Sequence, residues 1–238
     1  MFFYIYSKKY LLVAIMAIQL AVIYPQTYSL KILGFTIGEV KMDLSKSGLI
    51  ELKTKSSGVV DYIWPFENTY TTHFDTVNYS LRNYKKNIKQ GDFKQKLEGH
   101  WEKSDSTFQY NDSVLKRSPN IQNIFSILAR ILSQDADQFD TKWFTIEHEG
   151  SLYEARLLWN EIMDLKINSK SIPCDHYRLD LRLLKEETVL ADKTDFFSQY
   201  VVHPDAVRQI WVGVDNNKRI VRTSVKLKGI KIEANLKI

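Results

Sequence analysis

A cysteine and a histidine two residues apart form the pair with the most chemical potential in the sequence. Cys174-Asp-His176 could supply a thiol beside an imidazole or two ligands of a metal site. Zinc sites need three or four such ligands, and no second Cys/His pair follows at a usual spacing. A nucleophilic thiol would need a nearby base and a depressed pKa, which the surrounding residues do not indicate. The segment therefore predicts a turn with a partly buried cysteine, and we expect no metal and no cofactor.

The carboxylates and the other histidines lack the spacing of known catalytic motifs. The five histidines are scattered, and the His-Glu-x-x-His, Gly-x-Ser-x-Gly and phosphate-binding glycine patterns do not occur. Glu147 and Glu149 fall on one face of a strand, where they could serve glycoside hydrolysis, but such a pair more often predicts surface charges. We expect no catalytic residues and no enzyme. A glycan-acting hydrolase is the third alternative.

Aromatic and aliphatic side chains carry a stronger signal than the polar groups. The chain has five Trp, thirteen Tyr and twelve Phe. Two accounts stay open: these residues fill a core beneath a helix, or some of them line a groove for an apolar or amphipathic ligand, such as a lipid or acyl chain. The candidates for lining such a groove are Phe93, Leu97, Trp101, Tyr177, Leu179, Leu181, Ile124 and Leu128.

Strands with one apolar and one polar face must position these residues. Apolar and charged residues alternate in 38–44, 93–101, 177–183 and 230–238. Short connections such as 215–217 and Gly229 favour antiparallel hairpins. A meander of about a dozen such strands cannot stay flat, so we expect a mainly β chain curled into a barrel or half-barrel, or folded as a sandwich. Weaker strands are predicted near 27–33, 49–55, 68–75, 78–87, 106–114, 142–148, 152–160, 208–215 and 218–228.

Two interruptions of the alternation predict helices. Ser118 and Pro119 provide a helix start, and apolar residues then recur at spacings of three and four, so a helix is expected over about 119–133, packed on the dry face of the sheet. A shorter helix is expected over 57–64, ended by Pro65. Residues 187–205 predict a loop that could hold a helical turn. No linker interrupts residues 27–238, which we interpret as one domain.

The N-terminus predicts export. Lys8 and Lys9 precede an apolar stretch over 11–24, and Pro25 follows, which is typical of a secretory signal over residues 1–26. The region before Pro25 lacks the small-x-small pattern of a cleavage site, so an uncleaved membrane anchor is the alternative. Without residues 1–26 the chain has 31 basic and 28 acidic residues, since two lysines and no acid are removed. This mild surplus, interleaved with acids, argues against nucleic-acid binding.

Three segments resemble a family of bacterial proteins. Tyr28–Leu44, with Gly34 and Gly38 between two short strands, the segment Ser118–Leu128, and the Trp-containing hairpin Ile210–Val221 resemble the domain-of-unknown-function family 3108 (DUF3108). The resemblance implies an exported, mostly β protein of the Gram-negative envelope or periplasm, with no assigned reaction. Such a curled sheet is similar to the periplasmic lipoprotein carriers, which is an analogy of fold.

Taken together, the residues and the resemblance favour a non-enzymatic envelope protein whose concave sheet face binds an apolar cargo. In this hypothesis the cargo is held by burial of apolar surface, and the helix over 119–133 acts as a lid or plug. The alternative is an interaction module that binds another envelope protein by strand addition.

Overall fold

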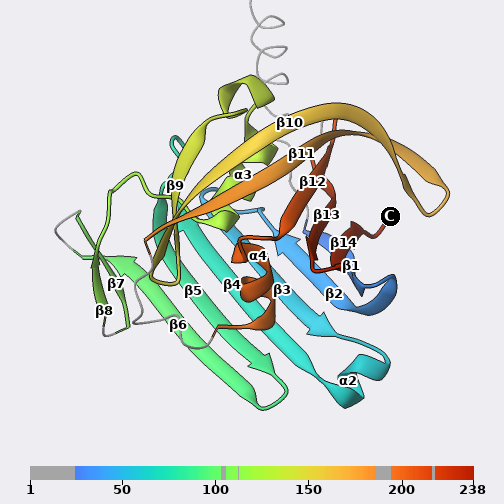
Figure 1. Ribbon diagram of the computed structural model, residues 1–238, viewed down its shortest axis with the longest axis horizontal. Helices are drawn as coiled ribbons and strands as arrows, with labels where there is room; N and C mark the ends of the chain where they lie inside the picture. The colour runs from blue at the N-terminus through green and yellow to red at the C-terminus, as the bar shows by residue number, and fades with distance from the viewer. Residues whose placement is uncertain (1–24, 103–105, 112, 186–193, 216–217) are drawn as a thin grey trace, which may run out of the picture.

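The computed structural model describes residues 25–102, 106–111, 113–185, 194–215 and 218–238 (Figure 1). Most of the predicted signal segment and of the predicted turn 215–217 lies outside the described residues, as does the beginning of the predicted loop 187–205. Within the described residues, the chain is mainly β and forms a single antiparallel sheet of 14 strands.

The sheet is a meander that runs in two directions from its first strand. One half contains β1 (Gln26–Ile32), β2 (Phe35–Asp43), β3 (Leu49–Ser56), β4 (Phe66–Phe74), β5 (Leu81–Gln90), β6 (Phe93–Trp101), β7 (Thr107–Tyr110) and β8 (Ser113–Lys116). The other half contains β9 (Trp143–His148), β10 (Ser151–Ile167), β11 (Lys170–Lys185), β12 (Val207–Gly213), β13 (Ile220–Leu227) and β14 (Ile230–Leu236). Pairing of β1 with β14 joins the two halves, and every other pair of neighbouring strands in the sheet is consecutive in sequence. The expected curled antiparallel meander is confirmed.

The sheet bends into an incomplete barrel that stays open between β8 and β9. A short extended segment crosses the opening. The Leu81 backbone amide at the start of β5 donates to the Ile121 carbonyl (2.7 Å), and the Gln122 amide donates to the Thr145 carbonyl of β9 (3.0 Å). Gln122 and Ile146 form an isolated parallel bridge. Residues 121 and 122 therefore cover part of the β9 edge.

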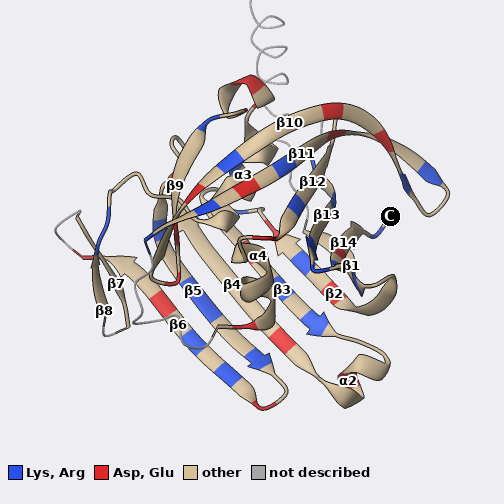
Figure 2. Ribbon diagram, in the orientation of Figure 1, with Lys and Arg blue, Asp and Glu red and all other residues tan. Residues whose placement is uncertain are grey.

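Alternation of apolar and polar residues explains which side of each strand is buried. On β6, Leu97 is buried while Lys94 and Lys96 are exposed, and on β14 Ile232 is buried while Lys237 beyond the strand is exposed. Basic and acidic residues are interleaved along the strands (Figure 2). The tight turns have the backbone that this pairing needs: Leu33 and Gly34 both have positive φ between β1 and β2, as is usual for two-residue hairpins.

Two helices fill the concave side of the sheet. Helix α3 (Ile124–Ser133) and helix α4 (Phe196–Val202) lie between the two halves of the bent sheet (Figure 1). The main apolar cluster combines α3 with residues of β1 to β4 and β9 to β14, and a second cluster lies on β5, β6 and β7. A third, smaller cluster lies on the outer side of β12, where Trp211 packs near Leu165 of the long β10–β11 hairpin. The concave face is therefore packed with protein side chains.

The helix boundaries correct the sequence expectations at two places. The helix expected over 119–133 begins at Ile124, because Asn123, and not Ser118, provides its N-cap: Asn123 Oδ1 accepts from the Ser126 amide (2.8 Å), and Ser126 Oγ accepts from the Asn123 amide (3.1 Å). Residues 187–205, expected as a loop that could hold a helical turn, contain α4. The expected helix over 57–64 is present as α2 (Val59–Ile63), which has no buried residue and lies at the end of β3 instead of on the concave face.

The capping box makes the stability of α3 depend on one side chain. Asn123 is buried and its Nδ2 also donates to Thr72 Oγ1 of β4 (2.9 Å). Asn123→Ala is expected to lower the free energy of unfolding by about 1–2 kcal/mol, because a cap and a buried partner of Thr72 are lost. Urea unfolding monitored by circular dichroism measures this change.

Asn120→Ala is the matched control, since Asn120 is exposed and lies three residues before the cap. It is expected to change stability by less than about 0.5 kcal/mol. A larger effect of Asn120→Ala than of Asn123→Ala would place the helix start nearer residue 119.

Candidate functional site

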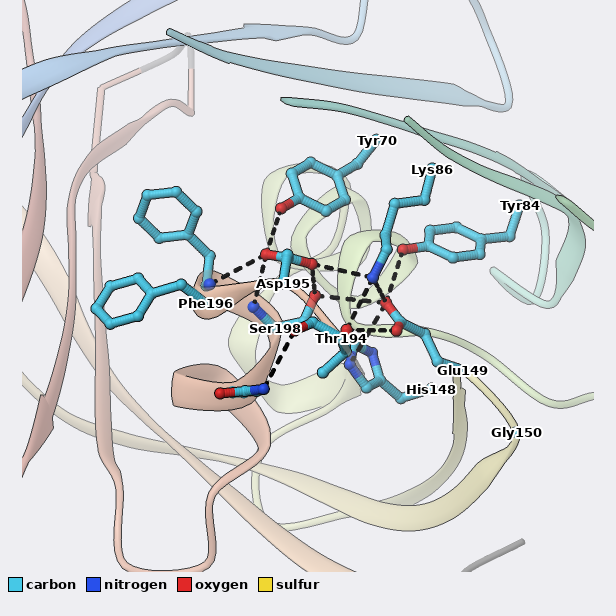
Figure 3. A network of polar contacts seen from close by, with 12 residues as sticks. Tyr70, Tyr84, Lys86, His148, Glu149, Gly150, Thr194, Asp195, Phe196 and Ser198 are labelled. Atoms are coloured by element: carbon cyan, nitrogen blue, oxygen red, sulfur yellow. Dashed lines mark hydrogen bonds and ion pairs between the residues drawn. The ribbon is translucent and has the colours of Figure 1, made fainter. Parts of the chain in front are cut away.

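A group of charged side chains is buried on the concave side, where three distant parts of the chain meet (Figure 3). Lys86 of β5 has a fully buried side chain, and its Nζ lies 2.6 Å from Glu149 Oε1 and 3.0 Å from Asp195 Oδ2. Glu149 is in the turn between β9 and β10, and Asp195 precedes α4. Lys86 Nζ also donates to Thr194 Oγ1 (2.8 Å). We call Lys86, Glu149, Thr194, Asp195 and Ser198 the lysine network.

Hydroxyl groups complete the lysine network. Tyr70 of β4 donates to Asp195 Oδ1 (2.8 Å), and Ser198 Oγ donates to Asp195 Oδ2 (2.6 Å). Thr194 Oγ1 donates to the second oxygen of Glu149 (2.6 Å). Each carboxylate thus has several donors, which is what allows a charge to be buried without a large net cost.

Asp195 also begins helix α4. Its Oδ1 accepts from the backbone amides of Phe197 (3.0 Å) and Ser198 (3.1 Å), so the same carboxylate caps the helix and pairs with Lys86. At the other end of α4, Arg208 of β12 donates to the Ala206 carbonyl (2.8 Å) and to the carbonyls of Val201 and His203. Polar contacts therefore hold α4 at both ends.

A second buried ion pair supports the turn that carries Glu149. Arg117 and Glu147 have nearly fully buried side chains and form an ion pair. Glu147 Oε1 accepts from the Gly150 amide (2.6 Å), and Arg117 Nη2 donates to the Gly150 carbonyl (2.9 Å). Glu149 itself has φ +51°, a conformation that L residues rarely adopt, and its side chain points into the lysine network. The hairpin tip is held in this strained form by ionic contacts on both sides.

Within the lysine network and the adjacent Arg117–Glu147 pair, two cations (Lys86, Arg117) face three carboxylates (Glu147, Glu149, Asp195). Burial raises the pKa of Glu147, and the nearby Arg117 only partly opposes this effect. Burial would also raise the pKa of Asp195, but the Lys86 ammonium and the hydrogen bonds from Ser198 and Tyr70 outweigh it, so this pKa is lowered. The Lys86 ammonium and the two hydroxyl donors therefore hold Asp195 in its charged form.

Sequence reasoning missed this site, although one signal for it is present. Glu147 and Glu149 were expected as surface charges, and both are buried. Lys86 lies between Tyr84 and Ile88 on the buried face of β5, so strict alternation places a lysine among apolar residues. A lysine at such a position is almost never fully buried without a partner, and that is the signal that could have found the network.

Cys174 and His176, expected in a turn with a partly buried cysteine, lie in a strand. Cys174 is fully buried within β11, and not in a turn, and burial raises the pKa of its thiol to about 11. The His176 ring stacks on Trp211 with ring centroids 4.7 Å apart. Among the described residues, no group of three or more His, Cys, Asp or Glu side chains is arranged to hold a metal ion.

The candidate groove residues fall into separate clusters. Tyr177, Leu179, Leu181, Ile124 and Leu128 come together in the main cluster, whereas Leu97 and Trp101 belong to the second cluster and Phe93 to neither. Two surface cavities of about 250 and 210 Å³ are lined mainly by polar side chains, including Lys89 and Lys94 in the first and Lys31 and Lys166 in the second. Neither cavity is lined by the groove candidates, whose role as a ligand surface stays a prediction.

The apolar side chains of α4 are only partly buried on the concave face. Phe196, Phe197, Tyr200, Val201 and Val202 are all half-buried and pack against the main cluster. Phe196 contacts Trp64 edge to face (5.6 Å between centroids), and Phe197 contacts Phe66 in the same way (5.6 Å). These aromatic rings lie next to α2, at the end of the sheet where β3 joins β4.

Comparisons with known proteins define the class of fold. No family model and no curated protein matches this chain. Among solved structures, the chain is similar to a β-barrel-like protein of the domain of unknown function DUF1849 from Brucella abortus, with a TM-score of 0.56, 9% sequence identity, and coverage of 90% of this chain and 94% of that chain. The chain therefore has a β-barrel-like fold.

Two other solved structures are less similar to this chain, although each alignment covers most of it. The hypothetical lipoprotein YmcC from Escherichia coli has a TM-score of 0.38 at 10% identity, covering 95% of this chain and 96% of that chain. A DUF1089 family protein from Pseudomonas aeruginosa has a TM-score of 0.29 at 11% identity, covering 87% and 88%. Among the described residues, no helix has the length and hydropathy needed to cross a membrane.

Removing the buried ammonium tests the lysine network. Lys86→Met is expected to lower the free energy of unfolding by about 3–5 kcal/mol, because Glu149 and Asp195 would lose their cation inside the protein. Lys85→Met is the matched control, since Lys85 is exposed and pairs with exposed Glu98. It is expected to cost less than about 1 kcal/mol. If urea unfolding showed the same loss of stability in Lys86→Met and Lys85→Met, the lysine network would contribute no specific stabilisation.

Acid is expected to weaken the fold through His148, which lies beside the lysine network. Burial lowers the pKa of His148, and its Nε2 has no hydrogen-bond partner. A lowered folded-state pKa means that the stabilising contribution is present above the unfolded value of about 6.5 and is lost as pH falls through the folded value. The lowered pKa of Asp195 acts in the same direction at lower pH, and the raised pKa of Glu147 acts in the opposite direction.

Urea unfolding at neutral and mildly acidic pH measures this dependence. His148→Leu is expected to reduce the loss of stability between about pH 7 and pH 5, because the neutral side chain cannot be protonated. His100→Leu, at an exposed position of β6, is the control and should leave the dependence unchanged. An unchanged pH profile in His148→Leu would contradict the assignment.

Proposed function

We propose that this chain is an exported, non-enzymatic protein of the bacterial cell envelope that binds an apolar or amphipathic molecule, such as a lipid or an acyl chain, on the concave face of its sheet. The observation that carries the proposal is α4: its five apolar side chains are only half-buried, although they lie on the concave face against the main cluster. If the α4 side chains moved away, a ligand acyl chain could pack in their place against the apolar residues of the main cluster.

Helix α4 is held by polar contacts at its two ends, which supports the idea that it can move away from the concave face as a unit. Its N-terminal end is fixed by Asp195 and Lys86, and its C-terminal end by Arg208. If the Asp195 contacts open, the apolar side chains of α4 can leave together, because the helix carries its own backbone hydrogen bonds. In this proposal α4, and not α3, is the plug, since the buried residues of α3 lie deep in the main cluster.

A non-enzymatic role is supported by the way in which the buried titratable groups satisfy one another. Lys86, Glu149 and Asp195 are paired inside the protein and do not line either of the two surface cavities. Export is supported by the basic and apolar pattern of residues 1–26, most of which lie outside the described part of the chain. Membership of the DUF3108 family stays a prediction.

The alternative, an interaction module that binds a partner by strand addition, has less support from the edges of the sheet. β8 has four residues and ends at exposed Lys116, and short, charged edges are a common means of preventing strand addition. The β9 edge is partly covered by Gln122. A third reading, glycan hydrolysis by Glu147 and Glu149, would require both carboxylates to leave their buried ion pairs.

Weakening the hold on α4 tests the proposal. Asp195→Asn keeps an oxygen that can cap α4 but removes the charge that faces Lys86. If the ion pair keeps α4 in place, the variant should bind a fluorescent long-chain fatty acid about tenfold more tightly than the unchanged chain, since the open form becomes more populated. Titration of the full chain with the fatty acid measures the apparent Kd.

Asp205→Asn is the matched control, because Asp205 is exposed and lies just after α4. It should bind like the unchanged chain. Mass spectrometry of natively purified protein should also find an amphiphile that leaves on delipidation. The proposal would be wrong if no amphiphile co-purified and the fatty acid gave the same signal with all three chains.

A further inference from the structure

One end of the sheet exposes apolar side chains on three adjacent connections. They are the β1–β2 turn, the β13–β14 turn and α2 between β3 and β4, and the strands that they join are consecutive in the sheet. The Leu33 amide donates to the Lys231 carbonyl (3.1 Å), and the Ser57 amide donates to the Ile37 carbonyl (3.0 Å), so the three connections are tied together. We call the exposed apolar residues here the apolar rim: Leu33, Phe35, Val59, Tyr62, Ile63 and Ile230.

The side chains of the apolar rim are exposed to an unusual degree. Tyr62 is 92% exposed, Ile63 78% and Phe35 77%. None of the residues of α2 is buried, so this short helix packs little of its apolar surface against the rest of the protein. Apolar residues that protrude together from neighbouring connections mark an interaction surface more often than single exposed residues do.

The three segments that carry the apolar rim are rich in lysine. Residues 31–36, 55–65 and 226–231 contain five lysines, one acid (Asp61) and no arginine. Lys55, Lys226 and Lys228 are exposed, while Lys231 pairs with Glu233 (2.6 Å). Protein interfaces are enriched in arginine and depleted in lysine, so this composition does not favour a protein partner.

We propose that the apolar rim docks on an anionic lipid surface. Protruding apolar tips with lysines close by suit a bilayer interface, because the tips enter the apolar boundary while the lysine stems extend along it and place the ammonium groups among the head groups. Trp64, which follows α2, contacts Phe196 of α4. Docking through the rim would therefore bring the α4 end of the concave face to the membrane, but it does not depend on the binding of a cargo.

A fluorophore on the apolar rim tests this proposal. Ile63→Cys is labelled in the full chain with an environment-sensitive dye, and Cys174 can remain because it is fully buried. With vesicles of phosphatidylcholine and phosphatidylglycerol, the emission should shift to the blue. The shift should be smaller with phosphatidylcholine alone and should decrease with added salt. The dye reports on its own position, so binding through another part of the chain leaves this signal unchanged.

Val77→Cys provides the matched control for position. Val77 is 83% exposed in the β4–β5 turn, at the opposite ends of the strands, and its dye should not respond to vesicles. An unchanged signal at Ile63, an equal change at Val77, or a shift at Ile63 that grows with protein concentration without vesicles would each overturn the proposal. The last result would indicate docking on protein.

Reversing the charge of two lysines near the rim tests whether they contribute to membrane binding. Lys55→Glu combined with Lys228→Glu should weaken binding of the Ile63-labelled chain to the anionic vesicles at least about tenfold. Lys94→Glu combined with Lys96→Glu changes the net charge equally, but on the outer face of β6, and should retain most of the binding. Equal weakening by the two pairs would overturn the assignment of the docking surface to the rim.

Discussion

The position of Lys86 is the constraint on which the interior of this protein depends. An ammonium group that is fully removed from water needs anionic partners, and here they come from a hairpin turn and a helix that are far from β5 in the sequence. Glu149 brings the tip of the β9–β10 hairpin under the sheet, and Asp195 brings the start of α4. The two halves of the meander are therefore held together on the concave side by charge, as well as at the β1–β14 pairing by backbone hydrogen bonds.

The buried ion pairs favour one arrangement of the interior more strongly than apolar packing alone does. Apolar side chains tolerate many arrangements of similar volume, whereas a buried ion pair that shifts out of reach leaves an uncompensated charge. Glu149 has a strained backbone, and the Arg117–Glu147 pair lies on the other side of the same turn. We infer that the ionic contacts fix the hairpin tip and α4 in one place, and that the apolar clusters supply most of the stability around them.

The sequence predicted the strands well because their signal is local. Alternation placed Leu97 inward and Lys94 and Lys96 outward, and short turns indicated antiparallel neighbours. The start of α3 was wrong because Ser118 and Asn123 are both good caps, and only the tertiary contact of Asn123 with Thr72 decides between them. The lysine network was missed for a related reason: Lys86, Glu149 and Asp195 come together only when the sheet bends, and the alternation along each strand does not indicate which residues meet across the bend.

The two kinds of charge in this protein have different physical consequences. Lys86, Glu149 and Asp195 are paired within the chain, so they hold α4 and the hairpin tip and are not available to a partner unless those elements move. The exposed lysines near the apolar rim are in water, where they attract anions over about 10 Å at an ionic strength of about 0.1 M and make no contact inside the protein. Because Trp64 contacts Phe196, a lipid surface at the rim would lie next to α4, whose apolar side chains are only half-buried. As proposed, docking at the rim and opening of α4 would therefore be separable steps, the first governed by exposed lysines and the second by the buried ion pairs.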